Sequence, residues 1–289
     1  MADKIVVTGC QGMLGRAVIS LLELTSTEHE VVPLTHADLD ISNDQQVLQV
    51  LGKIKPQVII NCAAYTDVDG AEEEKHLALA VNARGVRNLA LAAAEYQIFI
   101  CHFSTDYIFD GKKKEPYREW EEHWPLNYYG MSKQGGEEML ASLWDGYVLI
   151  RTSWLYGPGG KNFVDTVRNK LEAGETLRVV DDQFGAPTYV GDLAATAITL
   201  VDLRARGKYH FTNDAGNGVS WYEVAREIAS ISGYDPELIT PVKTADIEQE
   251  AERPAHSVLG LQKIKEMLPA MIRSWKDALR SYLGQQRQK

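Results

Sequence analysis

Short apolar runs alternate with amphipathic stretches along the first half of the chain. Several of these runs are continuously apolar, as in strands that are buried on both faces of a parallel sheet. The predicted strands are Lys4–Val7, His29–Leu34, Val58–Ala64, Phe99–Phe103 and Tyr147–Arg151. Stretches with helical spacing separate them, the longest being Leu77–Glu95. This alternation predicts an α/β fold built on a doubly wound parallel sheet.

The alternation loosens after Thr152, although no repeat or low-complexity linker separates the two halves. We predict helices at Asn162–Ala173, Asp192–Leu203, Trp221–Ser232 and about Trp275–Leu283, strands at Leu177–Val180 and His210–Phe211, and an extended segment at Thr240–Ser257. We therefore expect residues 1–155 to form the doubly wound domain. Residues 156–289 would form a smaller mixed α/β region, with segments around 177–205 returning to the first domain.

Composition and charge narrow the possible functions. The 289 residues are 45% hydrophobic and carry a net charge of -10, which argues against a nucleic-acid binder or a partner of anionic membranes. Three cysteines, few and close to predicted strands, are typical of reduced core residues. No signal peptide is recognisable before the first strand, and no apolar run approaches the ~20 residues of a membrane span. We expect a cytoplasmic protein.

A glycine-rich turn lies between the first strand and the first helix. In Thr8–Gly15, glycines stand at positions 9, 12 and 15. Glycines in such a turn permit tight turning and close approach of the backbone to a pyrophosphate, which the helix N-terminus then faces. A glycine loop without a ligand is the alternative, but the strand before the turn and the helix after it favour dinucleotide binding.

The end of the second strand does not distinguish NADPH from NADH. An acidic residue there would bind the adenosine 2′-hydroxyl, but Thr35 and His36 occupy the place. Arg16 and His36 could favour a 2′-phosphate. The choice between NADPH and NADH stays open.

A tyrosine and a lysine stand four residues apart in Tyr129-Gly-Met-Ser-Lys133. On a helix both side chains project from one face, and a neighbouring ammonium group lowers the pKa of a tyrosine. Such a pair can pass a proton to or from a carbonyl or an alcohol, although the same spacing also occurs in ordinary surface helices. The strand Phe99–Phe103 leads into Ser104-Thr105, at the sheet edge where α/β proteins bind ligands.

Several ordered segments together resemble the extended short-chain dehydrogenase/reductases, and more narrowly the dTDP-4-dehydrorhamnose reductase family. They are Thr8–Gly15, Asn61–Ala64, Ser104–Phe109, Pro125–Lys133, Arg151–Tyr156, Asp182–Thr188 and Arg253-Pro254. The resemblance covers the whole chain. It implies a Rossmann domain, an NADPH or NADH cofactor and a dTDP-linked 4-keto-6-deoxy sugar as substrate. It is also compatible with a homodimer.

The resemblance assigns roles to individual residues. Thr105, Tyr129 and Lys133 would be catalytic, with Tyr129 protonating the 4-keto oxygen and Lys133 binding the nicotinamide ribose. The cofactor would contact Gly9, Gly12, Met13, Leu14, Gly15, Asp40, Ile41, Ala63, Ala64, Tyr65, Phe103, Tyr129 and Lys133. The substrate would contact Thr105, Asp106, Tyr129, Trp154 and Arg253.

Some of these residues have structural alternatives. Trp154 could be a core residue, Asp106 a turn cap, and Thr105 the partner of a backbone group. No spacing argument supports Arg253 as an anion contact. Gly135 and Gly136 each cost the helix about 1 kcal/mol in propensity, which close packing against the sheet could explain.

The expected activity is reduction of a 4-keto sugar nucleotide, with two alternatives. A nucleotide-sugar dehydratase or epimerase is disfavoured, because the related dehydratases place a carboxylate directly after Thr-Asp, where Tyr107 stands here. A non-catalytic, dinucleotide-binding regulatory subunit would have no use for a proton donor. Some family members bind a metal ion through an acidic residue of the first helix. Ala17 occupies that region here, so we expect no metal.

Overall fold

A six-stranded parallel sheet forms the centre of the protein in the computed structural model, which describes residues 3–25 and 29–286. Its strands are β1 (Lys4–Thr8), β2 (Glu30–Leu34), β3 (Val58–Asn61), β4 (Phe99–Thr105), β5 (Tyr147–Thr152) and β10 (Gly207–His210). The strand order is β10-β5-β4-β3-β1-β2, and every pairing is parallel. The predicted doubly wound α/β fold is confirmed.

The order of the strands reverses at β1, which lies between β2 and β3. Connections leave β1 in one direction and β3 in the other, so a crevice forms outside their carboxyl ends. The register brings Thr8 beside Asn61, and Thr105 beside Thr152, at this edge. The edge is the place where open α/β sheets bind ligands.

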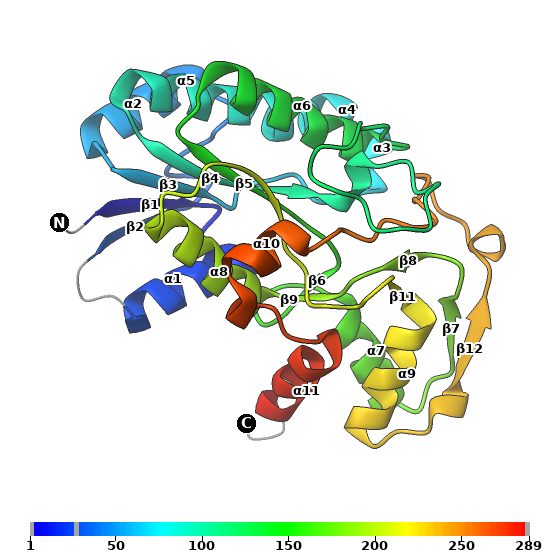
Figure 1. Cartoon of the computed structure of the whole chain (residues 1–289). Coiled ribbons are helices and arrows are strands. Elements are labelled where there is room, and N and C mark those ends of the chain that lie inside the picture. The colour runs from blue at the N-terminus through cyan, green and yellow to red at the C-terminus, as the bar shows by residue number, and fades with distance from the viewer. Residues whose placement is uncertain (1–2, 26–28, 287–289) are drawn as a thin grey trace.

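Helices cover both faces of the sheet (Figure 1). On one face lie α1 (Met13–Thr25), α8 (Val190–Asp202) and α10 (Gln262–Met267), and on the other α2 (Asp44–Ile54), α5 (Val86–Tyr96) and α6 (Tyr128–Leu143). Alternate residues of β1 feed the two cores, because Ile5 and Val7 face α1 and α8 while Val6 faces α2 and α5. Burial on both faces explains why the strands read as continuous apolar runs.

The predicted helix at Leu77–Glu95 contains a change of helical type. The structure has α3 (Gly70–Glu73), α4 (Lys75–Leu79), a π-helix (Ala80–Gly85) and then α5. Apolar spacing does not reveal such a wide turn, since the residues on either side keep a helical pattern. π-Helical turns occur frequently at functional sites.

A second group of elements packs at the lower centre and lower right of Figure 1. It contains α7 (Phe163–Glu172), α9 (Trp221–Ser232) and α11 (Trp275–Gln286), with the strand pair β7 (Leu177–Val180) and β12 (Ile239–Val242). Two short pairs, β6 (Leu155–Tyr156) with β9 (Thr188–Tyr189) and β8 (Phe184–Gly185) with β11 (Val219–Ser220), lie between this group and the main sheet. Single-turn 3₁₀ helices lie at Asp106–Ile108, Pro236–Leu238, Thr244–Asp246 and Pro269–Met271.

The chain returns to the main sheet after β9. Helix α8 packs on α1, and β10 adds the sixth strand beside β5. Strand β7, by contrast, pairs with β12 in the C-terminal group. Within the predicted segment 177–205, the return therefore begins at α8, and the domain division at residue 155 stays a prediction.

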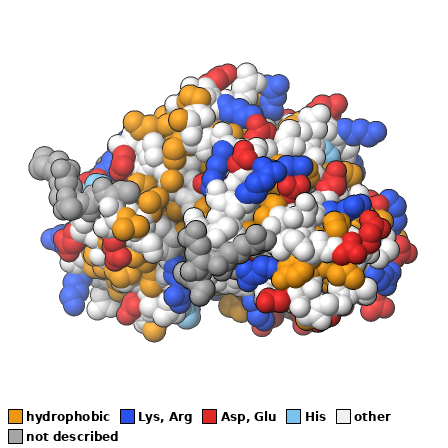
Figure 2. Space-filling model, turned by 90° about the horizontal axis from the view of Figure 1, so that it is seen from below, with side chains coloured by type: hydrophobic (Ala, Val, Ile, Leu, Met, Phe, Trp, Pro, Cys, Tyr) orange, Lys and Arg blue, Asp and Glu red, His pale blue; other side chains and the backbone are white. Residues whose placement is uncertain are grey.

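The surface carries charges of both signs. Figure 2 shows Lys and Arg side chains interspersed with Asp and Glu on the face seen from below, rather than gathered in one basic patch. Among the helices that the structure describes, none is long and apolar enough to cross a bilayer.

Helix α6 lies in close contact with the π-helix rather than with the sheet at Gly136. A Cβ atom at Gly136 would overlap the carbonyl oxygen of Asn82, whereas a Cβ at Gly135 would meet only the Ala83 side chain, at 3.2 Å. The two glycines that cost helix propensity thus differ in their tolerance of a side chain. Only Gly136 is required by backbone contact.

The first prediction compares these two positions. Gly136→Ala should destabilise the protein by about 1–3 kcal/mol, because an added methyl group has no space against the Asn82 carbonyl. Gly135→Ala, the control, should stay within about 1 kcal/mol of the wild type, since gained helix propensity offsets the tight contact. Urea unfolding measures both, and equal effects would contradict the packing argument.

Candidate active site

The glycine turn places the N-terminus of α1 at the carboxyl end of β1. Gly9 has φ +61°, and a Cβ there would lie 2.6 Å from the backbone nitrogen of Ala63. The amide of Gly12 donates to the carbonyl of Gly9 at 3.0 Å, and a Cβ at Gly15 would overlap that same carbonyl. Met13 and Leu14 then begin α1. The predicted pyrophosphate turn therefore has the geometry that dinucleotide binding needs.

Other predicted cofactor residues lie in the segments that follow β2 and β3. Asp40 accepts hydrogen bonds from the backbone amide and hydroxyl of Ser42, at 2.9 and 2.7 Å, and so shapes its own loop. Ile41 is buried, and its carbonyl accepts a hydrogen bond from Asn88. The half-buried Ala63, Ala64 and Tyr65 follow β3 directly.

Asn82 holds this segment in place, and the sequence analysis missed it. Its side-chain oxygen accepts from the Tyr65 amide, and its side-chain nitrogen donates to the Tyr65 carbonyl, both at 2.9 Å. The same nitrogen donates to Ser132 on α6. Asn82 therefore ties the chain after β3 to the helix that carries Tyr129. An asparagine within an apolar helical stretch was the available signal.

Thr105, Tyr129 and Lys133 meet at the carboxyl edge of β4. The hydroxyl groups of Thr105 and Tyr129 lie close enough to interact. The Nζ atom of Lys133 donates to the carbonyl oxygen of Phe103 at 2.6 Å. Asn127 caps α6 by accepting from the Gly130 amide, which fixes where the helix begins. The structure thus brings the three predicted catalytic residues and Phe103 together.

The protonation of the pair differs from the expectation of a tyrosine activated by its lysine. Burial raises the pKa of Tyr129 to about 12, the neighbouring Thr105 hydroxyl opposes this, and the charge of Asp106 adds to it. Burial lowers the pKa of Lys133 to about 8, against the attraction of Glu137. The expected lowering of the Tyr129 pKa by Lys133 is therefore wrong for this structure, where the ammonium group is directed at Phe103. At neutral pH, Tyr129 keeps its proton.

Asp106 is buried beside this group. The hydroxyls of Ser257 and Thr105 donate to its two carboxylate oxygens at 2.5 and 3.1 Å. Burial raises the pKa of Asp106 to about 7, although both hydrogen bonds oppose the shift. Asp106 is also the first residue of a 3₁₀ turn, whose cap is Thr105. Asp106 therefore has the turn position that a purely structural role would require, and it also lies beside Tyr129.

Arg253 reaches the same region through an ion pair that the sequence did not predict. Its Nη1 and Nη2 atoms donate to the two carboxylate oxygens of Asp69, at 2.5 and 2.6 Å. Arg253 also lies next to Tyr107, whose ring is 6.0 Å from that of Tyr129 in an edge-on arrangement. The segment before Arg253 is held by the Asn127 side chain, which donates to the carbonyl of Glu252.

Trp154 lies at the boundary with the C-terminal group. Its ring stacks on Trp221 with centroids 3.6 Å apart, and Phe163 packs against Trp221 at 4.5 Å. A Cβ at Gly185 would collide with the Trp154 indole. Trp154 has φ +49°, a backbone conformation that is unusual for a bulky residue. Trp221 was not predicted as a site residue.

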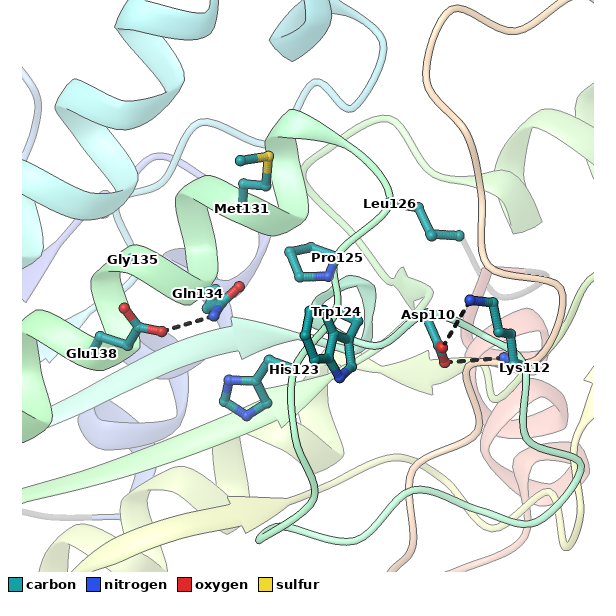
Figure 3. A pocket seen from close by; sticks show the side chains of 10 residues that line it. All are labelled: Asp110, Lys112, His123, Trp124, Pro125, Leu126, Met131, Gln134, Gly135 and Glu138. Carbon is teal, nitrogen blue, oxygen red and sulfur yellow. Dashed lines mark hydrogen bonds and ion pairs between the residues drawn. The ribbon is translucent and has the colours of Figure 1, made fainter.

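A cavity of about 760 Å³ lies between α6 and the loop that precedes it (Figure 3). Helix α6 contributes Met131, Gln134, Gly135 and Glu138 to it, and the loop before α6 contributes Trp124. Within the lining, Gln134 donates to Glu138 and Lys112 pairs with Asp110, whereas His123 bonds Arg151 outside it. The lining contains neither Tyr129 nor Lys133. This cavity is distinct from the predicted site.

Fold and site together define a Rossmann-like α/β protein with a tyrosine–lysine pair at the carboxyl edge of its sheet. The chain belongs to the family described as the RmlD substrate binding domain, whose model matches residues 3–288.

Relatives and solved structures agree with this membership. The chain is 39% identical to a dTDP-4-dehydrorhamnose reductase of Aggregatibacter actinomycetemcomitans, over 96% of this chain and 97% of that protein. It is 40% identical to a dTDP-4-keto-6-deoxy-D-glucose reductase of Streptomyces niveus, over 96% of each. The crystal structure of a dTDP-4-dehydrorhamnose reductase from Bacillus anthracis in complex with NADP matches with a TM-score of 0.94 and 37% identity, covering 99% of this chain and 100% of that one.

The second prediction concerns the pH dependence that Asp106 gives to stability. Its pKa of about 7 in the fold exceeds the value of about 4 of an unfolded aspartate, so its contribution to stability falls as pH rises between these values. Asp106→Asn removes this titration. From pH 5 to pH 7, the wild type should lose roughly 2 kcal/mol of unfolding free energy relative to the variant.

Asp110→Asn is the control. Although burial opposes it, hydrogen bonds from Tyr117 and Lys112 hold the pKa of Asp110 below its ordinary value. Urea unfolding should therefore give a constant difference between wild type and Asp110→Asn over the same pH range. A constant difference for Asp106→Asn as well would show that Asp106 does not titrate there.

Proposed function

We propose that this protein reduces the 4-keto group of dTDP-4-dehydro-L-rhamnose to give dTDP-L-rhamnose, with NADPH or NADH as the reductant and Tyr129 as the proton donor. The observation that carries the proposal is the meeting of Thr105, Tyr129 and Lys133 at the carboxyl edge of β4. The names of relatives that match almost the whole chain support the substrate.

The residues beside β1 and β3 suit a dinucleotide. The turn leaves no space for a side chain at Gly9 or Gly15, and the N-terminus of the 13-residue α1 faces the edge where a pyrophosphate would lie. Asp40 and Ile41 would flank the adenine, and Ala63, Ala64 and Tyr65 the path to the nicotinamide. The relative solved with NADP favours NADPH, while NADH remains a candidate.

The chemistry needs one hydride and one proton. When bound, the cofactor supplies the hydride to the carbonyl carbon. Tyr129 donates its phenolic proton to the carbonyl oxygen, and its raised pKa ensures that the proton is present at neutral pH. Thr105 would donate a hydrogen bond to the same oxygen. Lys133 would bind the nicotinamide ribose and place a positive charge near the tyrosinate that remains.

The substrate would extend from this point toward the C-terminal group. Asp106 and Trp154 would contact the sugar. Arg253, next to Tyr107, would contact an anionic group of the nucleotide. Its guanidinium can donate to such a group after one of its hydrogen bonds to Asp69 breaks.

A second candidate substrate is dTDP-4-keto-6-deoxy-D-glucose. The Streptomyces niveus relative, with similar identity and coverage, is named for dTDP-4-keto-6-deoxy-D-glucose. Both compounds need the same proton donor and differ in the shape presented to the pocket. Following nicotinamide absorbance with each purified sugar nucleotide gives two kcat/KM values, and the larger identifies the substrate. Failure with both contradicts the proposed function and favours a regulatory, non-catalytic role.

Dehydration fits the site less well. Tyr107 stands directly after Asp106, so no carboxylate is present at that position to serve as acid and base. Burial raises the pKa of Tyr107, which therefore keeps its proton at neutral pH. A cofactor that stays bound and is not consumed during turnover would favour the dehydratase or epimerase alternative.

The third prediction tests Tyr129 as the acid. Tyr129→Phe removes one hydroxyl and keeps the ring, so kcat should fall by about 10²–10⁴-fold with little change in cofactor affinity. Steady-state kinetics and cofactor fluorescence titration measure these two quantities.

Tyr128→Phe is the matched control. The ring of Tyr128 lies under the Lys75 ammonium group at 4.1 Å, away from Thr105, and the variant should keep nearly full activity. A crippled Tyr128→Phe together with an active Tyr129→Phe would move the site by one residue and refute the assignment.

The fourth prediction separates binding from structure at Arg253. Arg253→Gln should raise KM for the sugar nucleotide by about 10–100-fold, as expected for the loss of a charged hydrogen bond. Asp69→Asn breaks the same ion pair but keeps the guanidinium, so it should raise KM far less. Equal increases in the two variants would assign Arg253 a purely structural role.

A further inference from the structure

A buried carboxylate lies one helical turn beyond Lys133, and the proposed chemistry does not use it. Tyr129, Lys133 and Glu137 are spaced by four residues on α6 and therefore share one face of the helix. Glu137 is completely buried. A buried charge requires a partner and, in the absence of one, would be neutralised.

Arg151 on β5 provides that partner. Its Nε atom donates to one oxygen of Glu137 at 2.9 Å, and its Nη2 atom to the other at 2.8 Å, with both side chains fully buried. The other contacts of the guanidinium are the Glu119 carbonyl, His210 and His123. Lys208 on β10 approaches Glu137 at 3.4 Å. Glu137 is therefore held in one place and one orientation.

Stability alone does not account for this pair. Apolar side chains of similar volume often replace a buried ion pair without loss of stability, because the desolvation of both charges offsets their attraction. The pair also lies beside the catalytic residues. Arg151 is aligned in the sheet register with Ser104, which directly precedes Thr105. Its distinctive consequence is a buried carboxylate fixed on the helix face of Lys133, with the compensating Arg151 cation on β5.

We propose that Glu137, clamped by Arg151, is a positioning residue whose charge, one helical turn away, keeps the Lys133 ammonium group charged behind Tyr129. The inference rests on the proposed function, because it assumes that Lys133 takes part in the reaction. Without Glu137, the buried Lys133 ammonium group would keep its hydrogen bond to the carbonyl of Phe103. No anion on the same face of α6 would then stabilise its positive charge.

The groups that face Lys133 act in different directions. Burial lowers the pKa of Lys133 to about 8, and Glu137 raises it. His102 on β4 is buried, which holds its pKa well below the ordinary value, so it is neutral at pH 7. Burial opposes ionisation of Glu137, but hydrogen bonds from Arg151 bring its pKa to about 2. Of these groups around Lys133, Glu137 is the one that carries a negative charge across the working pH range.

The test is Glu137→Gln, which keeps the size and a hydrogen-bond acceptor for Arg151 but removes the charge. Activity requires charged Lys133, so kcat/KM should fall as pH rises through about 8 in the wild type. In the variant this fall should occur at a pH lower by about 1, with activity recovering toward pH 6. A variant that loses activity equally at every pH, with an unmoved alkaline limb, would overturn the proposal and leave a structural role.

Two further variants serve as controls. Glu138→Gln removes the same charge from the next position of α6, where the side chain is exposed and bonded to Gln134, and should leave the pH profile unchanged. Glu137→Asp keeps the charge and should keep the alkaline limb near pH 8 even if the shorter side chain lowers stability. A limb that moves as far in Glu137→Asp as in Glu137→Gln would contradict a charge-based role.

A measurement independent of turnover separates this inference from the proposed function. In protein labelled with ¹³C at the lysine side chains, the Lys133 resonance is assigned by its loss in Lys133→Met. Its NMR titration should centre near pH 8 in the wild type and lower in Glu137→Gln. An unchanged titration overturns the role of Glu137. Absence of sugar-nucleotide reduction by the wild type contradicts the proposed function instead.

Discussion

The close approach of α6 to its neighbours is the constraint on which the site depends. A Cβ at Gly130 would overlap the carbonyl oxygen of Tyr107, and one at Gly136 would overlap that of Asn82. Backbone therefore touches backbone near both ends of the catalytic stretch. Because the helix lies this close, Tyr129 reaches Thr105 and Lys133 reaches the carbonyl of Phe103. A larger residue at either glycine would move both side chains away from β4.

Burial at this edge sets the charges of the site. The same desolvation raises the pKa values of Tyr129 and Asp106 and lowers that of Lys133. Each group is thereby pushed toward its neutral form, and specific partners decide how far the shift goes. The result is a tyrosine that retains its proton for donation. The four-residue spacing of Tyr129 and Lys133 alone predicted a lowered pKa for Tyr129. That prediction includes the charge of the neighbouring ammonium group but not the desolvation of the tyrosine.

Local patterns were sufficient for most of the elements. Apolar runs and helical spacing predicted β1 to β5 of the main sheet and helices such as Trp221–Ser232, because regular burial leaves a regular pattern in the sequence. The strand predicted at His210–Phe211 overlaps β10 (Gly207–His210) at one residue. The π-helix at Ala80–Gly85 was missed, since one wide turn hardly disturbs the apolar spacing.

The sequence by itself determined the fold class, the glycine turn and the Tyr129–Lys133 pair, because these depend on residues close together in the chain. Only the tertiary structure decided how distant charges combine. Arg253 pairs with Asp69 across 184 residues, and Ser257 bonds Asp106 across 151. The partners of Arg151 likewise come from α6, β10 and the loop before α6. Such pairs follow no periodic spacing, since their geometry depends on how whole elements pack and on which charges lose their water together.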